Sequence, residues 1–155
     1  MGEGAIDLNG KVAIVTGAAR GIGAVIAAAF ARSGADLVIA DIDQDGTREM
    51  AEKMEVVGRK ALSVQADVAS ASDVDRLFSA VQAEFGGVDI LVNNAGIWFR
   101  KPFLEISDTE WDNVLSVNLK GTFMCCQRAA RMMMAKQTGS IINIASQAGI
   151  FYSRG

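Results

Sequence analysis

The sequence of 155 residues predicts an α/β fold with a doubly wound parallel sheet, formed by a single domain over residues 1–155. Short apolar runs of strand length alternate with longer stretches of helical periodicity, which is typical of successive β-α units. The apolar runs are continuous instead of alternating with polar residues, and this favours strands that helices cover on both faces. No linker, low-complexity tract or internal repeat divides the chain.

Five strands are expected, each a short apolar run. They lie at 12–15, 37–40, 61–64, 88–92 and 140–144. The run at 61–64 is the weakest of them. Right-handed crossovers between parallel strands would place helices on both sides of the sheet.

Four helical stretches are expected between these strands. They lie at 21–33, 43–57, 71–85 and 108–136. Gly34 is a plausible stop for the first helix, and Ser70 or Ser72 is a candidate N-cap for the third. Apolar residues recur at helical spacing in both of these helices. They are Ile22, Val25, Ile26, Ala29 and Phe30 in the first, and Val74, Leu77, Phe78 and Val81 in the third.

The last helical stretch is unusually apolar. It contains Trp111, Val114, Leu115, Phe123 and the methionines at 132–134. We expect a helix of this composition to bury more than one face. The additional face packs either within this chain or against a partner subunit, and the sequence favours neither.

Composition and charge argue against several classes of function. The formal net charge is −3 without a cluster of lysine and arginine, which argues against a nucleic-acid partner. The chain begins without a basic and apolar leader, and no apolar run approaches the roughly 20 residues of a membrane span. We therefore expect a cytoplasmic protein. The chain has no histidine and its cysteines, Cys125 and Cys126, are adjacent, so no metal site is expected.

A glycine-rich segment, Thr-Gly-Ala-Ala-Arg-Gly-Ile-Gly at 16–23, joins the first strand to the first helix. Glycines there let the backbone turn sharply and approach a pyrophosphate without clashes from Cβ atoms. The following helix offers free N–H groups and the positive end of its dipole to the phosphates. A tight turn without a ligand is the alternative, but the flanking strand and helix favour dinucleotide binding.

Asp41 ends the second strand of the predicted sheet. A carboxylate there can accept hydrogen bonds from both ribose hydroxyls of NAD, and it would repel the 2′-phosphate of NADP. Arg20 argues for NADP instead, because a cation in the glycine segment could reach a 2′-phosphate. The charge balance favours NAD over NADP as the cofactor. Asp41 could also be the N-cap of the next helix, which is compatible with ribose binding.

Four motifs in this order make the sequence resemble the short-chain dehydrogenases/reductases. They are the segment at 16–23, Asn93-Asn94-Ala95-Gly96 after the fourth strand, Asn118 in a Ser-Val-Asn-Leu run, and Ile144-Ala145-Ser146-Gln147-Ala148-Gly149 after the fifth strand. The resemblance extends from about Asn9 to about Gly149. It implies a Rossmann-like fold, a nicotinamide cofactor and a small-molecule alcohol or ketone substrate.

The resemblance also implies roles for individual residues. The phosphate-binding segment would comprise Gly17, Arg20, Gly21, Ile22 and Gly23. Asp67 and Val68 would contact the adenine, and Asn93, Ala95 and Gly96 would line the cofactor cleft. Asn118 would kink its helix and hold a water of a proton relay, and Ser146 would hydrogen-bond the substrate oxygen. Taken singly, Asn93 and Asn94 could be turn residues, Asn118 an exposed helix residue and Ser146 a hydroxyl bonded to backbone.

Hydride transfer to a carbonyl also needs a proton donor, and this is where the sequence departs from the family pattern. The family has a tyrosine roughly a dozen residues after the serine and a lysine four residues further, which lowers the tyrosine pKa. Here the only tyrosine is Tyr152, and no lysine follows Lys136. We therefore expect an incomplete domain with its C-terminal strands missing, inactive by itself.

Two functions are compatible with these observations. The first is an oxidoreductase that transfers hydride between NAD(H) and an alcohol or carbonyl substrate, such as a 3-oxoacyl thioester, a sugar or polyol, or a similar ketone. The second is a truncated, non-catalytic dinucleotide-binding module. The resemblance implies a homo-oligomer for the longer protein. Trp98 and Phe99 could line the substrate site or pack elsewhere.

Overall fold

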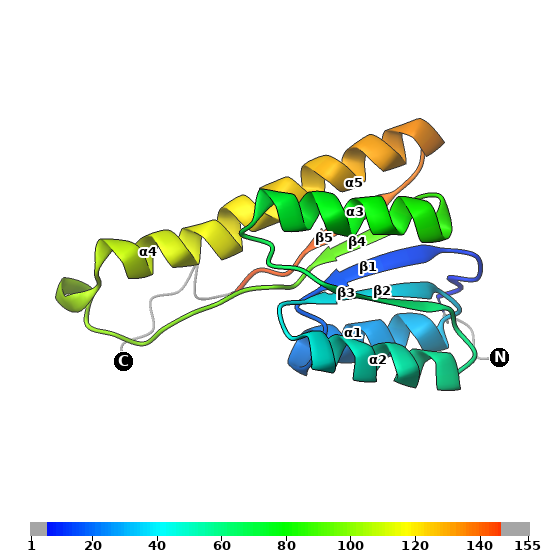
Figure 1. Ribbon diagram of the computed structural model, residues 1–155, viewed down its shortest axis with the longest axis horizontal. Helices are drawn as coiled ribbons and strands as arrows, with labels where there is room; N and C mark the ends of the chain where they lie inside the picture. Colours follow the sequence, from blue (N-terminus) through cyan, green and yellow to red (C-terminus); the bar gives the residue numbers. More distant parts are fainter. Residues whose placement is uncertain (1–5, 147–155) are drawn as a thin grey trace.

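Five parallel strands form one sheet in the order β3-β2-β1-β4-β5 (Figure 1). They are β1 Val12–Thr16, β2 Asp36–Asp41, β3 Ala61–Gln65, β4 Ile90–Asn93 and β5 Ser140–Asn143. This computed structural model describes residues 6–146 of the chain. Each of the five predicted strands is present, with limits within two residues of those expected.

The order of the strands reverses beside β1, the central strand. The chain adds β2 and β3 on one side of β1 and then crosses to add β4 and β5 on the other. Val15 of β1 accordingly lies opposite Ile39 of β2 and opposite Val92 of β4. In open parallel sheets, ligands bind outside the carboxyl ends of the strands at such a reversal.

Two helices cover each face of the sheet (Figure 1). One pair is α1 Gly21–Arg32 and α2 Gln44–Val56, and the other is α3 Ala71–Phe85 and α5 Thr122–Lys136. The fully buried side chains of β1 alternate between the two layers. Ile14 belongs to the core with α3 and α5, whereas Ala13 and Val15 belong to the core with α1 and α2. The doubly wound α/β fold predicted from the sequence is confirmed.

The third helix agrees with its prediction in both its cap and its buried face. The Ser70 side chain accepts a hydrogen bond from the Asp73 N–H at 3.3 Å, so Ser70 and not Ser72 is the N-cap. The residues of the predicted apolar stripe, Val74, Leu77, Phe78 and Val81, are all buried. Helix α3 therefore packs on the sheet through the stripe that its periodicity indicates.

Helix α1 buries only part of its predicted apolar stripe, since Ile26 and Phe30 pack partly buried against the core. Its buried residues are Gly23, Ala27 and Ala31, spaced one helical turn apart, whereas Ile22 and Val25 are each 66% exposed. Small side chains on the inner face let the helix axis approach the sheet closely. Gly34, with φ +102°, follows the end of α1 in the left-handed region, as the sequence predicts.

The last predicted helix is interrupted by a π-helical segment. Helix α4 Asp108–Leu115 is followed by η2 Ser116–Gly121, and α5 begins at Thr122. A short 3₁₀ helix, η1 Phe103–Glu105, precedes α4. Together α4, η2 and α5 form one long rod whose α4 end projects beyond the sheet (Figure 1). Single π turns inside longer helices are rare and often mark functional sites.

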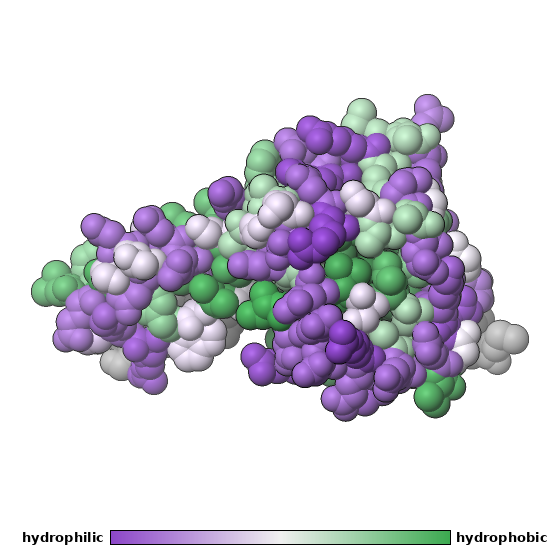
Figure 2. All heavy atoms as spheres, viewed as in Figure 1, coloured by the Kyte–Doolittle hydropathy of each residue, from purple (hydrophilic) through white to green (hydrophobic). Residues whose placement is uncertain are grey.

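The inner face of α5 joins the core through Met124, Cys125, Ala129 and Met133. Leu119 and Phe123, by contrast, are 65% and 59% exposed. Figure 2 shows apolar side chains on the projecting α4 lobe as well as between the two helical layers. Packing among residues 6–146 therefore accounts for only one apolar face of this rod. Within the same range, no helix has the length and apolar character needed to cross a bilayer.

Candidate functional site

A cleft of about 460 Å³ lies at the carboxyl ends of the strands, on both sides of the reversal between β1 and β4. It is lined by Gly17, Arg20, Asp41, Ile42, Ala66, Asp67, Val68, Asn94, Ala95, Gly96, Ile97 and Val117. These residues come from the last residue of β2, from the loops after β1, β2, β3 and β4, and from η2. The fold thus brings four separate loops to one edge of the sheet.

The glycine segment after β1 has no room for side chains at two positions. Gly17 has φ +64°, and a Cβ atom on it would lie 2.8 Å from the Ala95 Cα. A Cβ atom on Gly23 would overlap the Gly17 carbonyl oxygen and lie 2.6 Å from the Asn94 Nδ2. Gly17 is therefore required by the close approach of the Ala95 backbone, and Gly23 by the close approach of the Gly17 carbonyl and the Asn94 side chain.

Helix α1 begins at this cleft without a side-chain cap, unlike α2, α3 and α4. Its N-cap residue, Arg20, makes no side-chain cap hydrogen bond, and no acidic residue lies in its first turn. Helices α2, α3 and α4 are capped by the side chains of Asp43, Ser70 and Ser107, and each has an acidic residue in its first turn. The first N–H groups of α1 are thus left available to an anion.

Asp41 fastens the glycine segment to the end of β2. Its Oδ2 accepts a hydrogen bond from the Ala19 N–H at 3.1 Å, and its Oδ1 accepts one from the Asp43 N–H at 3.1 Å. The N-cap of α2 is Asp43, which accepts from the Gly46 N–H at 3.1 Å. The alternative role of Asp41 as this N-cap is therefore wrong, because the N-cap is Asp43, two residues after Asp41. The half-buried Asp41 carboxylate lines the cleft, and each of its oxygens can accept a further hydrogen bond.

Thr16 and Asn94 join the ends of β1 and β4. The buried Thr16 Oγ1 accepts hydrogen bonds from the N–H groups of Asn94 and Ala95, both at 3.1 Å. The Asn94 Nδ2 donates to the carbonyl oxygens of Thr16 at 3.0 Å and of Gly17 at 2.9 Å. This exchange of hydrogen bonds fixes one wall of the cleft relative to the other.

The turn after β3 presents one acceptor and one donor side by side. The Asp67 Oδ1 accepts from the Ala69 N–H at 2.8 Å. Among residues 6–146, the other Asp67 carboxylate oxygen and the Val68 N–H have no hydrogen-bond partner. Both residues line the cleft, and Val68 is buried. A carboxylate beside a backbone N–H can pair with a ligand edge that carries a donor next to an acceptor.

Asn118 lies in the π-helical segment and holds the loop after β4. Its Oδ1 accepts from the Ile97 N–H at 2.9 Å, and its Nδ2 donates to the Ile97 carbonyl at 2.9 Å. A side-chain amide that satisfies both backbone groups of one residue fixes that residue in place. Asn118 is thus not a freely solvated helix residue, although it is exposed and does not itself line the cleft.

Asn93 and Ser146, two further predicted residues, lie outside the cleft lining. Asn93 is 5% exposed, and its Nδ2 donates to the Asn143 Oδ1 at 2.8 Å and to the Cys126 Sγ at 3.2 Å. Ser146 is exposed in the segment after β5. The motif residues at 147–149, and Tyr152, lie outside the described residues.

Seven of the predicted cofactor-binding residues meet in the cleft: Gly17, Arg20, Asp41, Asp67, Val68, Ala95 and Gly96. Three others, Gly21, Ile22 and Gly23, belong to the start of α1 and do not line it. Sequence reasoning missed Ile42, Ala66, Asn94, Ile97 and Val117. The position of Asn94 inside the Asn-Asn-Ala-Gly motif was a signal for it, whereas the four apolar residues carry no recognisable pattern.

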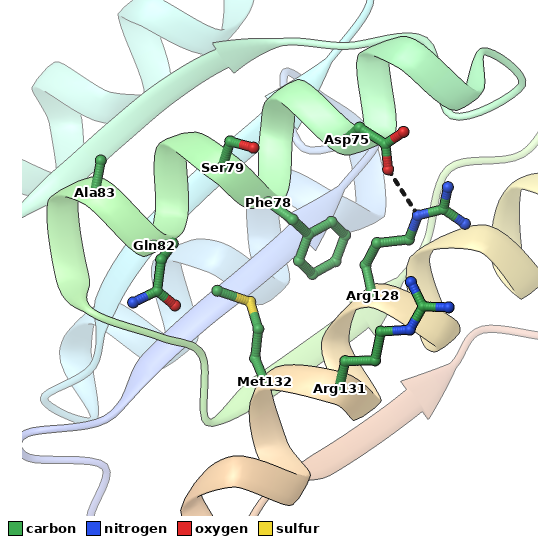
Figure 3. A pocket seen from close by; sticks show the side chains of 8 residues that line it. All are labelled: Asp75, Phe78, Ser79, Gln82, Ala83, Arg128, Arg131 and Met132. Carbon is green, nitrogen blue, oxygen red and sulfur yellow. Dashed lines mark hydrogen bonds and ion pairs between the residues drawn. The ribbon is translucent and has the colours of Figure 1, made fainter.

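A second hollow lies between α3 and α5 and shares no residue with the cleft. It is lined by Asp75, Phe78, Ser79, Gln82, Ala83, Arg128, Arg131 and Met132, and an ion pair between Asp75 Oδ1 and Arg128 Nε spans it at 2.9 Å (Figure 3). It lies on the outer helical layer and away from the ends of the strands that carry the motifs.

The cysteines and the acidic residues do not form a reactive or metal-binding centre in the part of the chain that is described. No group of three histidine, cysteine or carboxylate residues there could hold a metal ion. Burial raises the pKa of the Cys125 thiol to about 12, so its reactive thiolate does not form near neutral pH.

The fold and the position of the cleft define a doubly wound α/β protein whose strand order reverses beside a glycine-rich loop. The chain belongs to the short-chain dehydrogenase family, because residues 11–155 match the model of that family.

The similar proteins are longer than this chain. D-threitol dehydrogenase of Mycolicibacterium smegmatis is 44% identical over 141 residues, which cover 91% of this chain and 54% of that protein. Galactitol 2-dehydrogenase of Agrobacterium fabrum is 44% identical over 143 residues, 92% of this chain and 55% of that one. The crystal structure of a short-chain type dehydrogenase/reductase from Mycobacterium marinum superposes with a TM-score of 0.93 at 35% identity, covering 97% of this chain and 62% of that chain. The chain thus spans about half the length of the curated relatives it matches.

Proposed function

We propose that the chain is the cofactor-binding half of an oxidoreductase that transfers hydride between NAD(H) and an alcohol or carbonyl substrate. The observation that carries this proposal is the uncapped start of α1, which opens on a cleft shared with the carboxylates of Asp41 and Asp67. A dinucleotide needs this combination, since its phosphates are anionic and its riboses and adenine are hydrogen-bonding groups.

The cleft fits the phosphates of such a cofactor. Gly17 leaves its backbone bare at the point where the loop turns, because any Cβ atom there would meet Ala95. The N–H groups at the start of α1 and the exposed Arg20 would hold the pyrophosphate from one side. Gly23 would keep α1 close to the loop after β4, so that these donors face the cleft.

Asp41 supports NAD rather than NADP. Its two oxygens already fasten the loop, and their other lone pairs would accept the two ribose hydroxyls. A 2′-phosphate would bring its charge next to this carboxylate, and Ile42, the neighbour that lines the cleft, offers no compensating cation. Arg20 would then serve the pyrophosphate.

The turn at Asp67 and Val68 supports adenine as the base. The Val68 N–H would donate to the ring nitrogen N1, and the Asp67 carboxylate would accept from the exocyclic amino group. Ala66 and Ile97, which also line the cleft, offer apolar surface.

NAD, when bound, supplies a hydride acceptor or donor at its nicotinamide ring. The residues of this chain would orient it: Asn118 holds the Ile97 backbone, and the Thr16–Asn94 exchange holds the loop that carries Ala95 and Gly96. Ser146 would hydrogen-bond the substrate oxygen. No Tyr-x-x-x-Lys sequence follows Ser146 in these 155 residues, so we propose that they do not complete the proton transfer alone.

The substrate class of the longer protein is proposed from its relatives. Two of them are named as dehydrogenases of the polyols D-threitol and galactitol. This supports a polyol or sugar among the classes that the sequence leaves open. We further propose that the longer protein is a cytoplasmic homo-oligomer, since the exposed apolar residues Leu119 and Phe123 offer surface for a second subunit.

A non-catalytic dinucleotide-binding module is the second candidate. The observation that favours it is that these 155 residues hold the cleft but no Tyr-x-x-x-Lys sequence, so by themselves they would bind a cofactor without a group to move the proton. Both candidates share the binding step and differ in turnover.

The experiment that tests the proposal has two parts. We expect the chain to bind NADH more tightly than NADPH. Binding is measured by the blue shift and the increase in the fluorescence of the reduced nicotinamide. Absence of binding to a folded chain would overturn both candidates. Turnover of D-threitol, galactitol and a 3-oxoacyl thioester is then measured for the 155 residues and for the chain extended by the C-terminal half of the D-threitol enzyme. Activity only in the extended protein, abolished by Ser146→Ala, supports the oxidoreductase, and bound NADH without activity in either supports the module.

A further inference from the structure

We infer that Asp73 is a positioning residue for the cofactor, acting through the turn at Asp67 and Val68. Asp73 lies in the first turn of α3 and does not line the cleft. Its carboxylate holds the backbone of Asp67, which does line it. This inference rests on the proposed function, because the turn is the proposed adenine subsite.

The turn after β3 is closed by hydrogen bonds that converge on Asp67. Asp73 Oδ2 accepts from the Asp67 N–H at 3.0 Å. The Ser70 N–H donates to the Asp67 carbonyl at 3.0 Å, and the Ala69 N–H donates to the Asp67 Oδ1 at 2.8 Å. These bonds use the backbone N–H, the backbone carbonyl and one side-chain oxygen of Asp67. The oxygen that remains is the one proposed to meet the adenine amino group.

Arg76 fixes Asp73 in turn and ties it to the end of β3. Its NH1 lies 3.0 Å from the Asp73 Oδ1, and its NH2 donates to the Gln65 carbonyl at 3.3 Å. Ser70 caps the helix by accepting from the Asp73 N–H at 3.3 Å. The Asp67 N–H bond, followed by the Arg76 guanidinium, lowers the pKa of Asp73 below its ordinary value of 3.8, so the acceptor is charged at neutral pH. A charged acceptor makes a stronger hydrogen bond than a neutral one.

The opposite side of the turn is blocked by η2. A Cβ atom on Gly121 would lie 2.9 Å from the Val68 Cγ2 and 3.0 Å from the Val68 carbonyl oxygen, so the backbone of η2 touches Val68 directly. The turn is thus held between α3, through Asp73, and η2, through Gly121. Without the Asp73 bond, we expect the Asp67 peptide to move away from Gly121, so that the Asp67 carboxylate and the Val68 N–H lose their relative positions.

The chain offers a matched control two residues along the same helix. Asp75 also has its carboxylate in the early part of α3, but it pairs with Arg128 at 2.9 Å, across the hollow between α3 and α5 (Figure 3). Asp75→Ala removes the same charge from the same end of the helix without touching the turn. Asp73→Asn keeps an acceptor oxygen for the Asp67 N–H, while Asp73→Ala removes it.

The test compares these three variants with the unchanged chain by calorimetric titration with ADP-ribose. We expect Asp73→Ala to weaken binding about tenfold, the equivalent of one hydrogen bond to a charged group, while Asp75→Ala stays within about twofold and Asp73→Asn recovers most of the loss. Equal effects of Asp73→Ala and Asp75→Ala would overturn the inference and leave the proposed function standing. An unchanged chain that folds but does not bind ADP-ribose would overturn the proposed function.

A second measurement needs no ligand. Amide hydrogen exchange followed by NMR reports the Asp67 N–H directly in the free chain. We expect Asp73→Ala to raise the exchange rate of this amide at least about tenfold, and Asp75→Ala to leave it unchanged. If the Asp67 amide exchanges equally fast in the unchanged chain and in Asp73→Ala, the bond does not hold the turn. That result would overturn the inference regardless of which cofactor binds.

Discussion

The Thr16 hydroxyl accepts the Asn94 backbone N–H at 3.1 Å, and the Asn94 side-chain amide donates back to the Thr16 carbonyl at 3.0 Å. These residues are 78 positions apart in the sequence and lie at the ends of neighbouring strands. Since Thr16 is the first residue of the glycine segment and Asn94 precedes Ala95, the exchange joins the two loops that face each other across the reversal of the sheet.

We expect Asn94→Ala to lower the free energy of unfolding by about 1–3 kcal/mol, because the carbonyls of Thr16 and Gly17 both lose their donor. Urea denaturation monitored by circular dichroism measures the change. Asn113→Ala is the control, since Asn113 is an exposed asparagine on α4. Equal stability of the two variants would contradict a joining role for Asn94.

Asp41→Ala should relax the preference for NADH over NADPH. The variant loses the proposed ribose acceptors and also the charge that would repel a 2′-phosphate, so the ratio of the two dissociation constants should change at least about tenfold. Asp41→Asn separates the loss of charge from the loss of the bond to the Ala19 N–H, because the amide oxygen of asparagine can still accept that bond. Asp45→Ala, on the exposed start of α2, is the matched control. An unchanged ratio in Asp41→Ala would count against the ribose assignment.

Periodicity and continuous apolar runs were sufficient to predict the parallel sheet and the approximate limits of its strands. The glycine segment, Asp41 and the turn at Asp67 could be placed at one edge, because parallel strands end on the same side. The face of α1 was less predictable. Apolar residues lie on two sides of this helix, and burial of Ala27 and Ala31 in the core leaves Ile22 in solvent.

The π-helical segment could not be predicted from local pattern. Its position is associated with Asn118, whose side chain pairs with Ile97, 21 residues earlier in the chain. Such a contact depends on where the loop after β4 returns, which periodicity within 108–136 does not report. The role of Asn94 was missed for the same reason. Its side chain bonds to the carbonyls of Thr16 and Gly17, which are distant in the sequence and which the motif itself does not indicate.

The proposed adenine subsite gives a prediction about the base. Hypoxanthine replaces the exocyclic amino donor of adenine by a carbonyl acceptor, and its N1 becomes a donor. That edge would place its carbonyl against the Asp67 carboxylate and its N1–H against the Val68 N–H. We therefore expect the hypoxanthine analogue of NADH to bind at least about tenfold more weakly, because two pairings are lost and none is gained. Competition titration measures this, and equal affinities would show that the base lies elsewhere.

The capping box of α4 gives a prediction about pH. Glu110 accepts from the Ser107 N–H at 2.8 Å and the Ser107 hydroxyl at 2.7 Å, and the Lys101 ammonium lies 2.9 Å from both of its oxygens. The Ser107 N–H bond, followed by the bonds from Lys101 and the Ser107 hydroxyl, lowers the pKa of Glu110 from 4.5 to about 2. The cap and the Lys101 contact therefore connect the loop before α4 to the helix while Glu110 is ionised.

The sign of the pH effect follows from this lowered pKa. A carboxyl that is more acidic in the folded state stabilises it fully above pH 4.5, and this contribution is lost as pH falls from about 4.5 to about 2. We expect the N-terminal end of α4 to loosen over this window, measured by the fluorescence of the adjacent Trp111 and by amide exchange at Ser107. In Glu110→Gln both signals should already be in the loosened state at neutral pH and should change little over the same window. Glu105→Gln is the control, since it removes an exposed carboxylate from the preceding 3₁₀ helix, and both signals should change with pH as they do in the unchanged chain. If the transition between pH 4.5 and 2 persists in Glu110→Gln, another group causes the loosening.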